Sequence, residues 1–284
     1  MPAIDPIAAS VVSAIGFGFA DFMGGRAALR LGAPLTVALV QTVAAILMVG
    51  VVVLGGYPMP GSRGLLLGLG AGIVDGVALI LLYRGLAVGR IGVVAPLTGV
   101  CSIAVPAIAE VLFLTSFGPL IVSGIVLAAL AVVLIAHGSS SDDPDKPLGA
   151  SVVLGLAAGG TFGITTLFLG LLEPAEGNGG ALMMRVGAIA TVLAVVLVQW
   201  RSAKLDGRGF VIGTAGGLLD AVGSIGLVYS ATTYLIGVAS AINALYAGVT
   251  VLLGVALLGE RLGRAQIAGL LLGAVAILLL AQGH

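Results

Sequence analysis

RGLLLGLGAGIVD, residues 63–75, recurs in outline as RGFVIGTAGGLLD, residues 208–220. The offset between the two stretches is 208 minus 63, or 145 residues. Each stretch begins with an arginine, repeats glycine at every fourth position and ends in an aspartate within an apolar run. Glycines spaced by four share one face of a helix, so a neighbouring helix can approach that face closely. The matched Arg, Gly and Asp residues favour a duplicated segment over chance similarity between two apolar segments.

The composition around these stretches is that of a membrane protein. Of 284 residues, 12 are Lys or Arg and 12 are Asp or Glu, so 8% are charged, whereas 60% are hydrophobic. A soluble domain typically has about 25% charged residues, which cover its surface. The composition therefore excludes a soluble enzyme, and the zero net charge excludes a basic surface for nucleic acid.

Apolar runs divide the chain into ten segments, each near the roughly 20 residues that cross a bilayer. A polar linker, residues 138–147, separates the halves 1–137 and 148–284, which contain five segments each. An odd number of spans reverses the orientation of the second copy. The sequence thus predicts an all-α integral membrane protein with ten transmembrane helices in two inverted five-helix repeats. The spans are expected at roughly 7–25, 33–54, 64–89, 91–115, 117–137, 148–171, 180–199, 209–234, 236–259 and 262–282.

Two aspartates, Asp75 and Asp220, are equivalent in the repeat and lie about midway in spans 64–89 and 209–234. A charge in hydrocarbon costs at least about 2.5–3.5 kcal/mol on insertion scales, so it normally faces a polar interior. The pair could line a central cavity and bind a cationic group or take up a proton. A structural role is the alternative, with carboxyls that are neutral or capped by neighbouring polar side chains.

Arg185 and Glu110 are further ionisable residues inside spans. The planar guanidinium of Arg185 could hold a substrate carboxylate, or it could neutralise Asp220, Asp75 or Glu110. Glu110 lies deep in span 91–115, has no repeat partner and is a second candidate proton site.

Polar and aromatic residues in other spans could contact a solute. Helical spacing places Thr98, Cys101 and Ser102 on one face, and Asn243, Tyr246 and Thr250 on another. Small polar residues also hold membrane helices together, so a structural role is equally open. The remaining candidates are Phe17, Asp21, Gln41, Tyr83, Thr161, Phe162, Thr165 and Tyr229.

Pro96 and Pro106 interrupt the backbone hydrogen bonds of span 91–115. They predict either a kink or a locally unwound helix near a site at the membrane midplane.

Short motifs along the chain carry a family resemblance. They are IGFGFAD (15–21), AP (33–34), YRGLA (83–87), APL (95–97) and GERL (259–262) followed by Gly269 and Gly273. Their order resembles the drug/metabolite transporter superfamily, specifically its ten-helix EamA type. Phe17 replaces the family's usual Trp, Gln41 stands where the family commonly carries the Arg kept here at 185, and Thr115 replaces a Glu.

The resemblance implies a secondary transporter of the plasma (inner) membrane, often an exporter or exchanger of small metabolites, amino acids or drugs. A small-molecule substrate, membrane lipids and protons as coupling ion are the expected partners, in a monomer or homodimer. A lipid or drug flippase of the same fold is the alternative.

Enzymatic chemistry and cofactors are not expected. One cysteine and two histidines offer no metal site, and no P-loop is present. Two intramembrane aspartates could suggest an aspartyl protease, but Leu219 precedes Asp220 where such a protease needs glycine, and no Tyr precedes Asp75.

Basic residues predict a membrane orientation that a reporter can test. Only Arg63 lies on the side of the N-terminus, so the positive-inside rule places both termini outside, whereas the family resemblance implies the reverse. If the charge count is right, the C-terminus is outside, so alkaline phosphatase fused after His284 is active and a fluorescent protein fused there is dark. An inactive phosphatase and a bright fluorescent protein would contradict the charge count. The opposite side carries nine basic residues: Arg26, Arg30, Arg90, Lys146, Arg201, Lys204, Arg208, Arg261 and Arg264.

Overall fold

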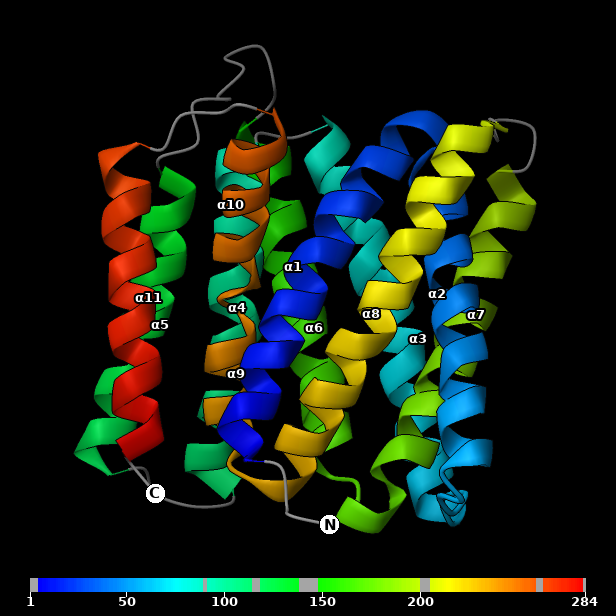
Figure 1. Cartoon of the computed structure of the whole chain (residues 1–284), viewed down its shortest axis with the longest axis horizontal. Coiled ribbons are helices and arrows are strands. Elements are labelled where there is room, and N and C mark those ends of the chain that lie inside the picture. The colour runs from blue at the N-terminus through cyan, green and yellow to red at the C-terminus, as the bar shows by residue number, and fades with distance from the viewer. Residues whose placement is uncertain are drawn as a thin grey trace.

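The computed structural model describes residues 5–88, 91–113, 118–137, 148–199, 205–258 and 263–282. Within those ranges every regular element is helical, and the helices stand side by side in one bundle with the start of the first helix and the end of the last at the same end (Figure 1). The elements are α1 (Pro6–Leu31), α2 (Ala33–Leu54), α3 (Ser62–Val88), α4 (Ile91–Phe113), α5 (Pro119–His137), α6 (Leu148–Gly170), η1 (Pro174–Glu176), α7 (Gly177–Gln199), α8 (Gly207–Thr233), α9 (Ile236–Asn243), α10 (Tyr246–Leu258) and α11 (Arg264–Gln282).

Six of these helices are long and apolar enough to cross a membrane, counted over the described residues: α1, α2, α3, α6, α7 and α8. Shorter apolar stretches lie in α4, in α5, across α9 and α10, and in α11. The chain therefore has the helices of a multi-pass membrane protein.

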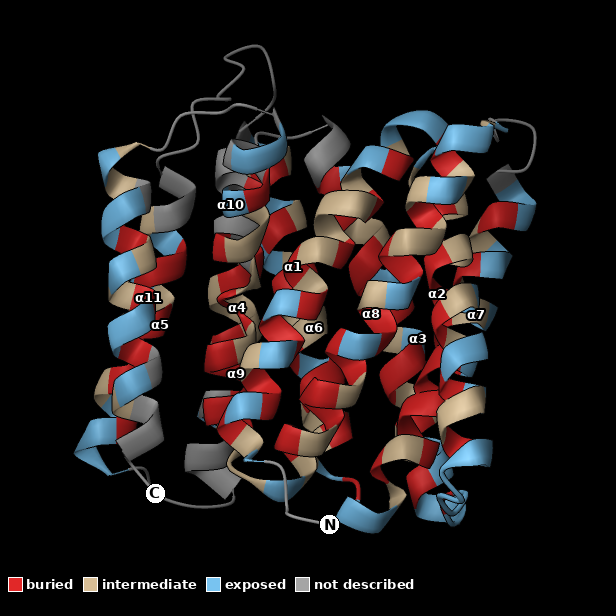
Figure 2. Cartoon of the chain, in the orientation of Figure 1, coloured by how far each residue is buried: buried red, intermediate tan, exposed pale blue. Residues whose placement is uncertain are grey.

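The distribution of burial suits lipid as the surrounding solvent. Large apolar side chains such as Leu29, Leu54 and Val198 are exposed on the outside of the bundle, whereas the largest fully buried side chain is Arg185. Figure 2 shows exposed residues along the outer faces of the helices and buried residues along the inner faces. A bilayer solvates the outer apolar atoms, so the polar side chains collect inside.

The two glycine ladders pack against different helices. On α3, a methyl group added at Gly68 or Gly72 would strike the backbone of α7 at Gly180 or Met184. On α8, a methyl group at Gly217 would lie 2.8 Å from the carbonyl oxygen of Val40 on α2. The close approach that the four-residue spacing predicts is confirmed at these positions.

The helix bounds repeat along the chain. Adding 145 to the bounds of α3, α4 and α5 gives 207–233, 236–258 and 264–282. These are the bounds of α8, of α9 and α10 taken together, and of α11. The packing repeats as well, if α1, α2 and α3 are taken as equivalent to α6, α7 and α8. Helix α1 packs on α8 as α6 packs on α3, and α3 packs on α7 as α8 packs on α2.

The unwound segment considered for span 91–115 is absent from the described residues, whereas a kink in that span stays a prediction. Despite Pro96 and Pro106, α4 runs unbroken as an α-helix, because a helix held within a bundle tolerates the lost hydrogen bonds. The break falls in the other half, at Ala244 and Leu245, where α9 ends and α10 begins. Hydrogen bonds there tighten to three-residue spacing, as from the Leu245 N–H to the Ile242 carbonyl at 3.1 Å.

Polar links join the two halves at opposite ends of the bundle. At the end away from the termini, the Arg30 guanidinium of α1 lies 3.3 Å from Asp206, the N-cap of α8. The Gly209 N–H, which donates to Asp206 at 2.6 Å, and the nearby Arg30 hold the pKa of this exposed carboxyl below its ordinary value. At the other end, the Gly61 N–H donates to Glu176 at 2.8 Å.

Basic residues gather at the end of the bundle opposite to the termini. The end of α1 contributes Arg26 and Arg30, and the starts of α8 and α11 contribute Arg208 and Arg264 (Figure 1). The other basic residues that the sequence assigns to this side lie outside the described residues, namely Arg90, Lys146, Arg201, Lys204 and Arg261.

Glycine at position 72 is expected to be essential for stability. A Gly72→Ala substitution places a methyl group against the α7 backbone, which cannot move aside, and overpacking of this kind costs about 1–3 kcal/mol. Gly50→Ala on α2 is the matched control, because no atom lies within 4 Å of the added methyl group. Thermal unfolding in detergent should show a lower midpoint for Gly72→Ala alone; equal midpoints for the two variants would contradict this account of the packing.

Candidate functional site

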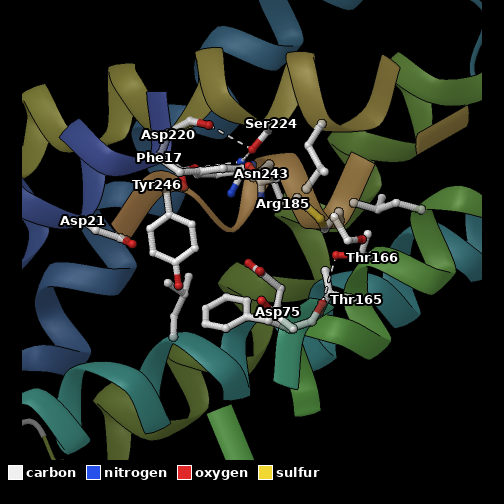
Figure 3. A pocket seen from close by; sticks show the side chains of 17 residues that line it. Phe17, Asp21, Asp75, Thr165, Thr166, Arg185, Asp220, Ser224, Asn243 and Tyr246 are labelled. Carbon is white, nitrogen blue, oxygen red and sulfur yellow. Dashed lines mark hydrogen bonds and ion pairs between the residues drawn. The ribbon is translucent and has the colours of Figure 1, made fainter. Parts of the chain in front are cut away.

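A cavity of about 70 Å³ lies among the central parts of the helices (Figure 3). One water molecule needs roughly 10–15 Å³ by the same measure, so the cavity has room for several waters or a small chemical group. Its walls come from α1, α3, α4, α6, α7, α8, α9 and α10 and consist of Phe17, Asp21, Asp75, Leu79, Ser102, Phe162, Thr165, Thr166, Leu169, Met184, Arg185, Asp220, Ser224, Leu227, Ser240, Asn243 and Tyr246.

Asp75 and Asp220 are the central residues of their helices. Both α3 and α8 have 27 residues, and 75 minus 62 and 220 minus 207 both equal 13. At about 1.5 Å rise per residue, each carboxyl lies roughly 20 Å from either helix end. Both side chains are buried and line the cavity.

Arg185 ties α7 to the neighbouring helices. Its guanidinium forms an ion pair with Asp220 at 2.7 Å and also donates hydrogen bonds to the Ser224 hydroxyl and to the side-chain oxygen of Gln41. The side chain is only 1% exposed. A buried guanidinium needs such partners, because an uncompensated charge in a low-dielectric interior is strongly unfavourable.

Gln41 extends this network to the second aspartate. Its amide group donates a hydrogen bond to Asp75 at 2.7 Å, while its oxygen accepts from Arg185. Gln41 does not line the cavity itself. It links Asp75 to Arg185 from behind the cavity wall and leaves Asp75 without a cationic hydrogen-bond partner among the described residues.

The glycine ladders position this network. Gly72 lies one turn before Asp75 and packs on Met184, the residue before Arg185. In the same way, Gly217 lies one turn before Asp220 and packs on Val40, the residue before Gln41. The small residues therefore bring each aspartate to the level of the polar residue on the facing helix.

Asp21 reaches the cavity from α1 (Figure 3). Among the described residues, none forms a hydrogen bond or an ion pair with its carboxyl group. Of the three carboxyls in the cavity wall, Asp21 is the one that has no hydrogen-bond or ion-pair partner among the described residues.

The break between α9 and α10 brings further polar groups to the cavity. Asn243 ends α9, Tyr246 begins α10, and both line the cavity with Ser240. Ser13 of α1 donates a hydrogen bond to the Asn243 side chain at 2.7 Å, and Thr250 of α10 donates to the Gly18 carbonyl of α1 at 3.0 Å. Helix α1 therefore holds the break in place from both sides.

Nine residues that the sequence nominated for the site meet in this cavity: Phe17, Asp21, Asp75, Ser102, Thr165, Arg185, Asp220, Asn243 and Tyr246. Phe162, which was considered with them, also belongs to the cavity wall. They come from helices that are distant in sequence, so the fold assembles them.

Other nominated residues lie elsewhere. Thr98 is fully buried and donates to carbonyls of Val94 and, at 3.3 Å, of Gly155 on α6, which is the role of a polar contact between helices. The Thr161 hydroxyl donates to carbonyls of its own helix, and neither Tyr83 nor Tyr229 is part of the cavity wall. The side chain of Glu110 lies outside the described residues.

Several wall residues escaped the sequence reasoning. Ser224 follows Asp220 by four residues and Ser240 precedes Asn243 by three, so helical spacing from a nominated residue could have found both. The apolar members Leu79, Leu169, Met184 and Leu227 and the polar Thr166 gave no signal that separates them from core residues.

Comparison with known proteins adds evidence on the fold. No family model and no curated protein matches the sequence. One solved crystal structure, described only as that of a protein, superposes with a TM-score of 0.77 over 96% of both chains at 10% sequence identity. At that identity the likeness shows a shared fold alone.

Removal of the Arg185 charge is expected to destabilise the fold. Arg185→Gln leaves Asp220 buried without its cation, and breaking a buried pair from one side typically costs about 3–5 kcal/mol. Adding Asp220→Asn removes the orphaned charge and should recover part of the loss. Thermal unfolding in detergent measures both effects, and a double variant less stable than Arg185→Gln would contradict the pairing.

Proposed function

We propose that this chain is a secondary transporter that exports or exchanges a small polar or amphiphilic metabolite across the plasma (inner) membrane. The observation that carries the proposal is the cavity between the two halves, with two buried aspartates at the exact midpoints of 27-residue apolar helices. Charges held at that depth are costly, and in membrane proteins they mark paths for solutes and ions.

The architecture supports the proposal. We count α9 and α10 as one span broken at Ala244 and Leu245, which gives ten spans in two sets of five. The 145-residue shift of helix bounds and the exchange of packing partners are what two inverted repeats would produce. Transporters of that design bind solute near the midplane between the repeats and use interrupted helices there.

The motifs of the sequence support assignment to the EamA-type branch of the drug/metabolite transporter superfamily. Gln41 and Arg185 occupy matching places in the second and seventh spans. They bond to each other, which gives a physical reason for a polar residue at this place in both spans. The cavity of about 70 Å³ is large enough for one small chemical group of such a substrate.

The geometry favours solute transport over the alternatives. An aspartyl protease needs two carboxyls that share a proton, whereas Asp220 binds Arg185 and Asp75 binds Gln41. A second cavity, of about 200 Å³ between α1, α9, α10 and α11, is lined only by apolar residues and glycine. It suits lipid chains, but it offers no polar group for the headgroup that a flippase must carry.

Transport can be tested in proteoliposomes. Leucine, putrescine and uridine are first screened for thermal stabilisation of the purified protein, and the stabilising solute is then used in counterflow. Asp75→Asn should lower counterflow by at least about tenfold, because this carboxyl faces the cavity, while Glu173→Gln on an exposed loop should leave it unchanged. Absence of counterflow for every solute would overturn the proposal, and undiminished flux in Asp75→Asn would remove this residue from the pathway.

A further inference from the structure

The charges of the cavity wall do not balance. Three carboxyls, Asp21, Asp75 and Asp220, face one guanidinium, Arg185. That guanidinium is paired with Asp220. Asp75 accepts a hydrogen bond from the neutral amide of Gln41, and no described residue bonds to Asp21. Asp21 and Asp75 therefore form no ion pair with a cationic side chain of the described part of the chain.

A ligand cation is the compensation that the surroundings favour. Buried carboxylates are stable when paired, and among the described residues of the wall Arg185 on α7 is the one cationic side chain. Across the described residues, no three His, Cys, Asp or Glu side chains lie close enough together to hold a metal ion. The carboxyls are spread over the wall, which suits an organic cation better than a bare metal ion.

The remaining wall supplies the other contacts that an organic cation needs. Three aromatic residues, Phe17, Phe162 and Tyr246, share the cavity with aliphatic Leu79, Leu169 and Leu227. Figure 3 shows the side chains of Asp21, Tyr246 and Asp75 around the same cavity. Aromatic faces attract ammonium groups by cation–π interaction, and the aliphatic wall can cover an apolar body.

An unsatisfied hydroxyl is independent evidence for a missing ligand. Ser240 is only 4% exposed, lines the cavity, and its Oγ has no hydrogen-bond partner among the described residues. Buried polar atoms without a partner are rare in folded proteins, so this oxygen is poised for a group from the ligand. Arg185 Nε also lacks a hydrogen-bond partner among these residues, which makes an anionic group on Arg185 the rival arrangement.

We infer that the transported solute is a small organic cation, whose protonated amino group binds between Asp21 and Asp75 while its apolar body lies against Phe17, Phe162 and Tyr246. Asp220 and Arg185 neutralise each other and position the wall. This inference rests on the proposed function and adds the chemical class of the substrate.

Three four-carbon ligands that differ in the charge of their head group test the charge preference. Calorimetric titration of the full chain in nanodiscs uses butylammonium, butyrate and butanol, with leucine as the zwitterion. Butylammonium is expected to bind at least about tenfold more tightly than the other three. Asp21→Asn and Asp75→Asn should each weaken its binding by about tenfold or more, whereas the exposed-loop variant Glu173→Gln should not.

The outcomes separate this inference from the proposed function. Tighter binding of butyrate or leucine, equal binding of all four, or unchanged butylammonium binding in Asp21→Asn would overturn the cation assignment. Counterflow of any solute by the same preparation would still support a transporter. If Asp21→Asn does not fold, Asp21→Glu replaces it: retained preference for butylammonium supports the inference, and preference for butyrate overturns it.

Discussion

The ion pair between Arg185 and Asp220 is the constraint on which the bundle depends. It joins the largest fully buried side chain of the described residues to the central residue of α8. Through Gln41 the same guanidinium is linked to Asp75, the central residue of α3. A rotation of any of these helices would strand a charge in a low-dielectric interior, so the network fixes their depth and rotation together.

Close packing of α3 on α7 and of α8 on α2 accompanies that network. Side chains of ordinary size between α3 and α7, or between α8 and α2, would hold these helices too far apart for direct contact. Gly72 and Gly217 remove that obstacle one turn before each aspartate. No residue that the structure describes forms a hydrogen bond or an ion pair with Asp21 on α1, so the cavity retains a carboxyl that these residues do not use.

Periodic features of the fold could be predicted from the sequence, and features that depend on single contacts could not. Apolar length and glycine spacing are local, so the helices and their close faces follow from them. Thr98 and Ser102 share the same pattern, yet one bonds to α6 and the other reaches the cavity. The break at Ala244 and Leu245 contains no glycine or proline, and hydrogen bonds with α1 hold the helices on either side of it. Helix α4, by contrast, is continuous although it contains two prolines.

The buried guanidinium also constrains how the protein is made. Helix α7 precedes α8 in the chain, so Arg185 enters the bilayer before Asp220 is available to it. The insertion cost of the charge, about 2.5–3.5 kcal/mol, falls on a helix that is otherwise strongly apolar. Gln41 on α2 precedes Arg185 in the chain and bonds to it in the folded bundle. The order of these helices in the chain thus places one hydrogen-bond partner of the charge before it and its ion-pair partner after it.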